Sequence, residues 1–275
     1  MNSELARSLP IGVFDSGVGG LTVLKALREA LPAEDLVYLG DTARLPYGTK
    51  SPKSIERYAC QATRLLQEQG IKLLVVACNT ASAVALDALK AQMSPLPVIG
   101  VVEPGASAAV QAKPGGSHLV LATEATVRLG AYRRAIEHLD AAASVREHAC
   151  EMLVSLAEEG WTDGEIATAI IRRYLDDASA SASSPDSVIL GCTHFPLLRD
   201  AIERCLEPGT TVVDSATTTA AVASRMLDET GLRSDGDTAG AIELLATDGA
   251  TRFARVGGAF LGGKLDASDI RLVDL

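Results

Sequence analysis

Short runs of apolar, often β-branched residues alternate along the chain with longer segments in which apolar residues recur at helical spacing. The alternation favours an α/β fold in which mostly parallel sheets are flanked by helices. The longer segments predict amphipathic helices, including Leu21–Leu31, Ser54–Gln69, Ala81–Gln92 and Trp161–Asp177. The short runs predict strands at Ile11–Asp15, Leu36–Leu39, Lys72–Ala77, Val98–Val102, Leu119–Ala122, Val188–Leu190, Thr211–Asp214 and Ile242–Thr247.

Two of these strands belong to a weak internal repeat. The segment Leu73–Thr80 is echoed by Ser187–His194, and each is an apolar strand that ends in a small residue, a cysteine and polar residues. Ligands of open α/β sheets bind beyond the carboxyl ends of the strands, so Cys78 and Cys192 are expected where substrates bind. Two related halves that face each other would bring both thiols to one cleft.

The repeat predicts two pseudo-symmetric α/β domains with the active site in the cleft between them. Glycine and proline at Glu103–Gly105 and Lys113–Gly116 suggest a boundary near residue 103. The first domain is expected to comprise residues 1–102 and 214–275, with Asp15 and Cys78, and the second residues 103–213, with Cys192 and His194. The low-complexity run Ala178–Pro185 is predicted to be a mobile surface loop.

Composition narrows the classes of function. The 275 residues are 47% apolar, which fits a globular protein, and the net charge of −10 argues against nucleic acid or an anionic membrane as partner. A small anionic substrate is compatible with that charge, because one pocket can present donors that the whole surface does not. No apolar run reaches the roughly 18 residues of a membrane helix, and the first ten residues lack a signal-like basic cluster, so we expect a cytoplasmic protein.

The cysteines suggest chemistry rather than disulfides. All five, Cys60, Cys78, Cys150, Cys192 and Cys205, are scattered without CxxC or Cys/His ligand spacing, which argues against a disulfide scaffold or a zinc site. Inverting an α-carbon requires a base on one face and an acid on the other, which two thiols on mirrored strands can supply. Both are expected to precede helix starts, which would lower a thiol pKa from about 8.5. A single cysteine at a strand end is equally typical of a small core residue, and that interpretation is kept for the three outside the repeat.

Two further features lie beside the cysteines. The segment Phe14–Gly20 follows the first strand and opens a helix, which suits an anion held on backbone N–H groups, although it is also typical of a tight turn. It is not a Walker loop, and Thr22 stands where the dinucleotide fingerprint requires glycine. Asp15 could orient a substrate ammonium group or assist Cys78. His194 could tune Cys192 or bind a carboxylate, or it could be only a capping histidine.

Four blocks of sequence resemble the glutamate racemases, which supply D-glutamate to bacterial cell-wall synthesis. The resemblance covers nearly the whole chain and rests on Asp15–Thr22, Gly40–Gly48, Ala77–Ser82 and Gly191–Pro196. It implies a homodimer that needs no cofactor and no metal, in which Cys78 abstracts the α-proton of D-glutamate and Cys192 that of L-glutamate.

The resemblance also implies roles for the neighbours of the thiols. Asp15, His194 and Glu158 would support them, although Glu159 leaves the register of that glutamate open. The sequence departs from the family pattern at Ser155, where proline is usual, and at Leu129, where serine is usual. Without the resemblance, Tyr47 is better explained by packing and Asn79 by helix capping. The implied substrate-binding residues are Asp15, Ser16, Tyr47, Gly48, Asn79, Thr80, Thr123, Thr126, Thr193 and His194.

Three alternatives stay open at this point. An aspartate racemase or related isomerase would use the same chemistry, although the block around Tyr47 and Gly48 favours glutamate. A non-catalytic, two-lobed protein that binds acidic amino acids would not require two thiols. A thiol redox protein is disfavoured, because CxxC is absent and the two cysteines end separate strands.

Overall fold

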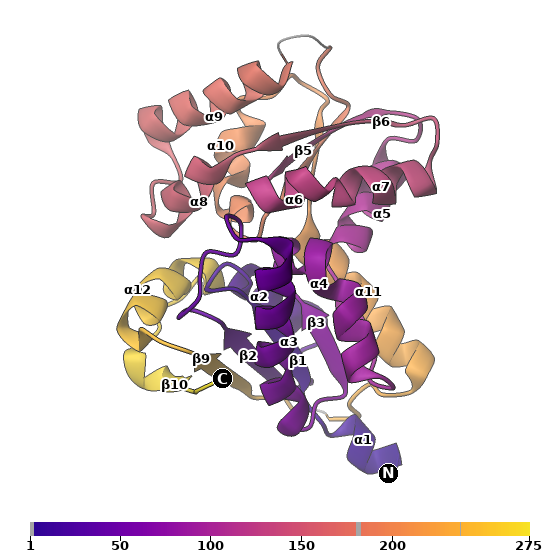
Figure 1. Cartoon of the computed structure of the whole chain (residues 1–275), viewed down its shortest axis with the longest axis vertical. Coiled ribbons are helices and arrows are strands. Elements are labelled where there is room, and N and C mark those ends of the chain that lie inside the picture. Colours follow the sequence, from indigo (N-terminus) through magenta and orange to yellow (C-terminus); the bar gives the residue numbers. More distant parts are fainter. Residues whose placement is uncertain (1–2, 180–182, 237) are drawn as a thin grey trace.

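The computed structural model describes residues 3–179, 183–236 and 238–275, and two parallel sheets form its framework. Figure 1 shows them in two lobes stacked along the long axis of the molecule. The first lobe contains a six-stranded sheet in the order β10-β9-β2-β1-β3-β4, and the second a four-stranded sheet in the order β6-β5-β7-β8. The strands are β1 (Ile11–Asp15), β2 (Leu36–Gly40), β3 (Leu73–Val76), β4 (Val98–Gly100), β5 (Ser117–Ala122), β6 (Ser144–Ala149), β7 (Ser187–Gly191), β8 (Thr211–Asp214), β9 (Ile242–Ala246) and β10 (Ile270–Leu272).

Helices cover both sheets, as parallel strands require. The first lobe carries α1 (Ser3–Arg7), α2 (Leu21–Ala30), α3 (Pro52–Glu68), α4 (Asn79–Met93), α11 (Ser215–Thr230), α12 (Ala250–Leu261) and the 3₁₀ turn η2 (Ala267–Asp269). The second carries α5 (Val102–Ala112), α6 (Glu124–Leu129), α7 (Ala131–Leu139), α8 (Glu151–Glu158), α9 (Gly164–Ser179), η1 (Phe195–Leu198) and α10 (Arg199–Glu203). The chain passes between the lobes at β4–α5 and again at β8–α11.

The central strands are buried on both faces. All five residues of β1 and all five of β7 are inaccessible or nearly so, which explains why both read as continuous apolar runs rather than as alternating patterns. The helices α2 and α11 pack against each other on one face of the first sheet, while α3 and α4 pack together as a second pair. Because every paired strand runs parallel to its neighbour, the carboxyl ends within each sheet lie along one edge.

The predicted α/β class is confirmed, whereas some boundaries were wrong. The strand predicted to extend to Val102 ends at Gly100, and Glu103–Gly105 lies in the first turn of α5 rather than in a loop. Pro104 fits there because the first N–H groups of a helix have no intrahelical acceptor. The domain limits at residues 102 and 213 stay a prediction, and residues 180–182 of the predicted mobile loop lie outside the described residues.

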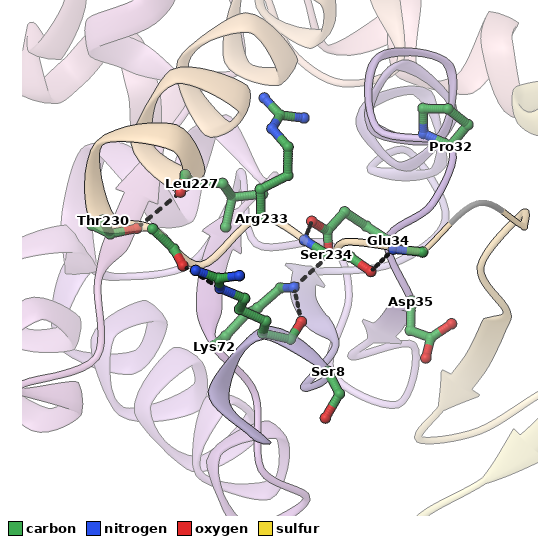
Figure 2. Close-up of polar contacts among 12 residues, drawn as sticks. Ser8, Pro32, Glu34, Asp35, Lys72, Leu227, Thr230, Arg233 and Ser234 are labelled. Atoms are coloured by element: carbon green, nitrogen blue, oxygen red, sulfur yellow. Dashed lines mark hydrogen bonds and ion pairs between the residues drawn. The ribbon is translucent and has the colours of Figure 1, made fainter. Parts of the chain in front are cut away.

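A buried ion pair lies at the amino ends of β2 and β3, away from the thiols. Lys72 Nζ lies 2.5 Å from Glu34 Oε2, with side chains only 1% and 2% exposed (Figure 2). The other oxygen of Glu34 accepts a hydrogen bond from Ser234 N at 2.8 Å. This pair therefore fixes the segment after α11 against the amino ends of β2 and β3, and removing one partner would leave a buried charge.

Among the described residues, no helix is both long enough and apolar enough to cross a bilayer.

Candidate active site

The predicted thiols lie at the carboxyl ends of strands in opposite lobes. Asp15 is the last residue of β1, Cys78 follows β3, and Cys192 follows β7. Hydrogen bonds connect the lobes nearby. Among them, Thr22 Oγ1 donates to Thr193 O at 3.1 Å, Ala125 N donates to Gly48 O at 3.0 Å, and the hydroxyls of Thr80 and Thr123 lie 2.9 Å apart. The two strand edges therefore meet, as the internal repeat predicted.

Cys78 lies at the amino end of α4. Its Sγ accepts a hydrogen bond from Ala81 N at 3.4 Å and donates to Ser16 Oγ at 3.4 Å. Burial raises the pKa of the Cys78 thiol to about 11, the charge of Asp15 raises it further, and the donors at Ser16 and Ala81 only partly compensate. The predicted helix start is present, but the expected lowering of the thiol pKa is outweighed by desolvation.

Cys192 differs from Cys78 in its local support. The 3₁₀ turn η1 begins at Phe195 and runs directly into α10, so the helix start predicted after Cys192 is a 3₁₀ turn rather than an α-helix. The Sγ of Cys192 lies 3.8 Å from Nδ1 of His194. Burial raises the pKa of Cys192 well above its ordinary value, and the charges of Cys78 and Asp15 raise it as well. These three groups are therefore close enough to affect one another's ionisation.

Glu158, at the end of α8, is the carboxylate beside His194. Its Oε1 lies 3.2 Å from His194 Nε2, whereas Glu159 is exposed and follows the end of the helix. The hydrogen bond with His194 lowers the pKa of Glu158, with further lowering from Arg252. An acceptor at Nε2 leaves Nδ1 facing the Cys192 sulfur, which is the geometry needed for proton exchange between ring and thiol.

Asp15 is a buried carboxylate with incomplete hydrogen bonding. Its Oδ2 accepts from Gly17 N at 2.8 Å, while Oδ1 has no partner among the described residues. Burial raises the pKa of Asp15, and the charge of His194 and the N–H groups of Gly17, Gly20 and Ser16 lower it less. An unsatisfied buried acceptor is costly for folding, and a ligand ammonium group could satisfy it.

Replacing Asp15 by asparagine is therefore expected to raise the melting temperature at pH 7. A carboxyl whose pKa is raised by folding contributes stability that is fully present below about 3.8 and is lost as pH rises through the folded pKa. The difference between Asp15→Asn and wild type should therefore shrink as pH falls toward 4. Thermal unfolding between pH 4 and 7 measures it, with the exposed Asp176→Asn as control. A melting temperature unchanged at pH 7 would contradict the assigned cost of burial.

Buried hydroxyl and amide groups line the contact between the lobes. Thr123 and Thr126 lie 3.1 Å apart, and Thr80 approaches both. Asn79 Nδ2 donates to Tyr132 Oη at 2.7 Å, and the N-cap of α4 is Cys78, so the interpretation of Asn79 as a helix cap is wrong. Thr193 Oγ1 lies 3.4 Å from His194 Nδ1. These groups are neutral donors and acceptors, which suit carboxylates without an arginine clamp.

The side chain of Tyr47 is buried within the first lobe, which is not the position expected of a residue that binds substrate. It is 1% exposed, packs near Phe14, and its hydroxyl donates to Asp41 at 2.5 Å. Its phenol therefore orders the loop that presents Gly48, whose carbonyl accepts from Ala125 N. A direct role of Tyr47 in substrate binding stays a prediction.

Three residues near the site were missed from sequence. Tyr132 and Ser215 share a hydrogen bond of 2.8 Å and both contact Asn79, while Arg252 contacts Glu158. Each comes from a helix far away in sequence, and none belongs to a motif. A pattern of helical spacing identifies a buried face but does not identify its partner.

The structure contains a small cavity at the contact between the lobes and a larger groove between helices. A cavity of about 140 Å³ lies between the lobes and is lined by first-lobe residues, among them Thr42, Asp248 and Arg252, together with Glu158 of the second lobe. A larger groove of about 900 Å³ lies between α4, α5, α7 and α11 and contains none of the predicted site residues. Neither hollow is lined by Cys78 or Cys192. We assign the chemistry to the contact between the lobes around these two thiols, because that is where reactive groups converge. Within the described part of the chain, no cluster of three His, Cys, Asp or Glu residues could hold a metal ion.

Known proteins resemble this chain in both architecture and sequence. The family model described as Asp/Glu/Hydantoin racemase matches residues 11–223. A glutamate racemase of Geobacter metallireducens is 47% identical over 255 residues, which cover 93% of each chain. The crystal structure of a glutamate racemase from Francisella tularensis in complex with D-glutamate has a TM-score of 0.89 at 33% identity, with 98% of each chain covered.

A second solved structure agrees with the first. The glutamate racemase of Thermus thermophilus, in complex with β-chloro-D-alanine, has a TM-score of 0.86 at 42% identity, again over 98% of each chain. Identities of this size over almost the full length leave no large part of the fold unmatched. The chain therefore belongs to the Asp/Glu/hydantoin racemase family and, within it, to the glutamate racemases.

Proposed function

We propose that the chain interconverts L- and D-glutamate by a two-base mechanism that uses Cys192 and Cys78. The observation that carries the proposal is the pair of buried thiols at facing strand ends in the two lobes, each with its own proton-exchanging neighbour. The complex of the Francisella relative with D-glutamate supports glutamate as the substrate. Closure of the lobes around the substrate excludes water from a weakly acidic carbon centre.

Each turnover moves one proton on each face of the α-carbon. With L-glutamate, Cys192 as thiolate removes the α-proton, and Cys78 as thiol donates a proton to the opposite face. The product is D-glutamate, with Cys192 now protonated and Cys78 ionised, and the reverse direction exchanges these roles. Because burial raises both thiol pKa values, both rest protonated near neutral pH, so each needs a base nearby. Asp15 serves Cys78, and His194 serves Cys192.

The remaining predicted residues bind the substrate in this proposal. Hydroxyls at Ser16, Thr80, Thr123, Thr126 and Thr193 and the amide of Asn79 surround the cleft and can hydrogen-bond carboxylates. The unpartnered Oδ1 of Asp15 suits the ammonium group. A role in supplying D-glutamate for peptidoglycan, a cytoplasmic location and a homodimeric state are further parts of the proposal, and they rest on the kinship with glutamate racemases.

Loss of circular dichroism from enantiopure D-glutamate tests the proposed activity. The purified chain is incubated with D-glutamate or with D-aspartate, without added cofactor and with a chelator present. We expect the signal to decay to zero with glutamate, because racemisation has an equilibrium constant of one. Decay with aspartate alone would identify an aspartate racemase, and a signal that persists with both would favour a binding protein. Buffer without protein controls for spontaneous racemisation.

A further inference from the structure

One ion pair joins the two lobes within the part of the chain that the structure describes. Arg252 Nη2, on α12 of the first lobe, lies 2.6 Å from Glu158 Oε2, on α8 of the second. Every other ion pair of the described residues joins side chains within one lobe. The pair is partly open to solvent, since 52% of the Arg252 side chain is exposed, so its contribution to folding stability is expected to be small.

The significance of this pair lies in the group that it orients. Glu158 uses Oε2 for Arg252 and Oε1 for His194 Nε2, so the guanidinium fixes which oxygen faces the imidazole. His194 in turn presents Nδ1 to the sulfur of Cys192. A continuous chain of polar contacts therefore runs from a helix of the first lobe to the thiol of the second.

The same helix also contacts His194 directly. Phe260, about two turns after Arg252 on α12, packs edge-on against the imidazole, with ring centroids 5.1 Å apart and an interplanar angle of 80°. Phe260 is buried, and α12 is anchored in the first lobe by its packing on α2. The orientation of His194 thus depends on an element of the opposite lobe, and both contacts require the lobes to be together.

We propose that Arg252 is a positioning residue for the Cys192 half of the reaction, which couples closure of the lobes to the orientation of Glu158 and His194. The proposal rests on the racemase activity proposed above. When the lobes close, Arg252 binds Oε2 of Glu158, and Oε1 then holds the imidazole in line with the thiol. When they open, the carboxylate and the ring lose this constraint, so Cys192 is supported only in the closed state.

Arg252→Gln tests the proposal, with Arg252→Lys and Arg255→Gln as matched variants. Arg255 is exposed on the same helix and makes no ion pair among the described residues, so its substitution produces the same charge change without the contact. We expect kcat/KM to fall about fivefold in Arg252→Gln, the scale of a partly exposed ion pair. Arg252→Lys should recover most of this loss, and Arg255→Gln should behave as wild type.

Substrate isotope effects distinguish positioning from a general structural defect. In Arg252→Gln the step at Cys192 becomes slower relative to the step at Cys78. The deuterium effect with α-deuterated L-glutamate should therefore rise, because Cys192 abstracts that deuteron, and the effect with α-deuterated D-glutamate should fall. A variant that is only partly folded would lose rate without changing either isotope effect.

The outcomes separate this proposal from the proposed function. If wild type fails to racemise glutamate, the proposed function fails. If wild type is active and Arg252→Gln keeps both its rate and its isotope effects, the positioning role is overturned and the racemase assignment stands. A loss of rate with unchanged isotope effects, or an equal loss in Arg255→Gln, would also overturn the positioning role.

Discussion

Serine in place of Cys78 or Cys192 is expected to lower kcat/KM for glutamate racemisation by about a thousandfold, within the range of lost general acid–base catalysis. The hydroxyl is nearly the same size, so the fold should persist, but it does not ionise to a useful base. Both thiols are buried at strand ends; Cys192 contacts His194, and Cys78 lies close enough to Asp15 for that charge to raise its pKa, so we place both on the reaction path. The measurement is the initial rate of loss of circular dichroism from each enantiomer.

The loss must be equal in the two directions. The equilibrium constant of a racemisation is one, so kcat/KM for L-glutamate and for D-glutamate are equal in every variant. The assignment of faces therefore has to come from isotope effects. Cys192→Ser should raise the deuterium effect with L-glutamate and lower it with D-glutamate, and Cys78→Ser should do the opposite. Identical isotope effects in both variants would contradict the assignment of one thiol to each face.

A third cysteine provides the control. Cys60 lies on α3, is only partly buried and has no role in the proposed chemistry, so Cys60→Ser should keep the wild-type rate. If Cys60→Ser lost activity as strongly as the two thiol variants, the losses would reflect a general sensitivity of the fold to substitution of cysteine by serine. If Cys78→Ser or Cys192→Ser kept full activity, the two-base mechanism would be wrong.

The sequence predicted the buried strands well and the exposed strands poorly. Strands such as β1 and β7 are covered on both faces, so their residues are almost all apolar. The edge strand β6 is Ser-Val-Arg-Glu-His-Ala and is half exposed, and β10 has three residues, of which only Ile270 is buried. Neither carries an apolar run. Their pairing depends on neighbours distant in sequence, which a local pattern does not record.

The sequence predicted which residues lie at the candidate site, but it did not predict the pKa values of the two thiols. The repeat placed Cys78 and Cys192 at facing strand ends, because the position of a residue in a parallel strand fixes the edge at which it emerges. The effect of burial on their pKa values could not be predicted, since it depends on how completely the two lobes exclude water. The contact of Arg252 with Glu158 was also beyond prediction, because it joins helices 94 residues apart in the chain.

The glycine-rich loop after β1 is another case in which a contact with a distant segment could not be predicted from the local sequence. A tight turn was one interpretation, yet none of Gly17, Gly19 and Gly20 has positive φ, so left-handed backbone is not what requires glycine there. The requirement at Gly19 comes from the opposite lobe. A Cβ atom at this position would lie far inside van der Waals contact of Thr193 Oγ1 and His194 Nδ1. Glycine allows the two lobes to meet at the second thiol.

Alanine at Gly19 is therefore expected to lower kcat/KM by about a hundredfold, the scale of a catalytic group displaced by about 1 Å. The added methyl group must push Thr193 and His194 away, and it does so at the interface rather than inside the core of either lobe. The melting temperature should change by only a few degrees, the shift typical of about 1 kcal/mol in a domain of this size. Circular dichroism of the variant and its racemisation rate measure the two effects on one sample.

Gly17 provides the matched control within the same loop. A Cβ there would meet only Leu45 Cδ2, at an ordinary distance of 3.5 Å, so Gly17→Ala should lose little activity. Equal losses in both variants would mean that loop flexibility, rather than contact between the lobes, is what glycine provides. Full activity in Gly19→Ala would show that the lobes need not approach this closely during turnover, and the closed cleft would then not be the state in which Cys192 reacts. A selective loss at Gly19 would identify this contact between the lobes as part of the catalytic geometry.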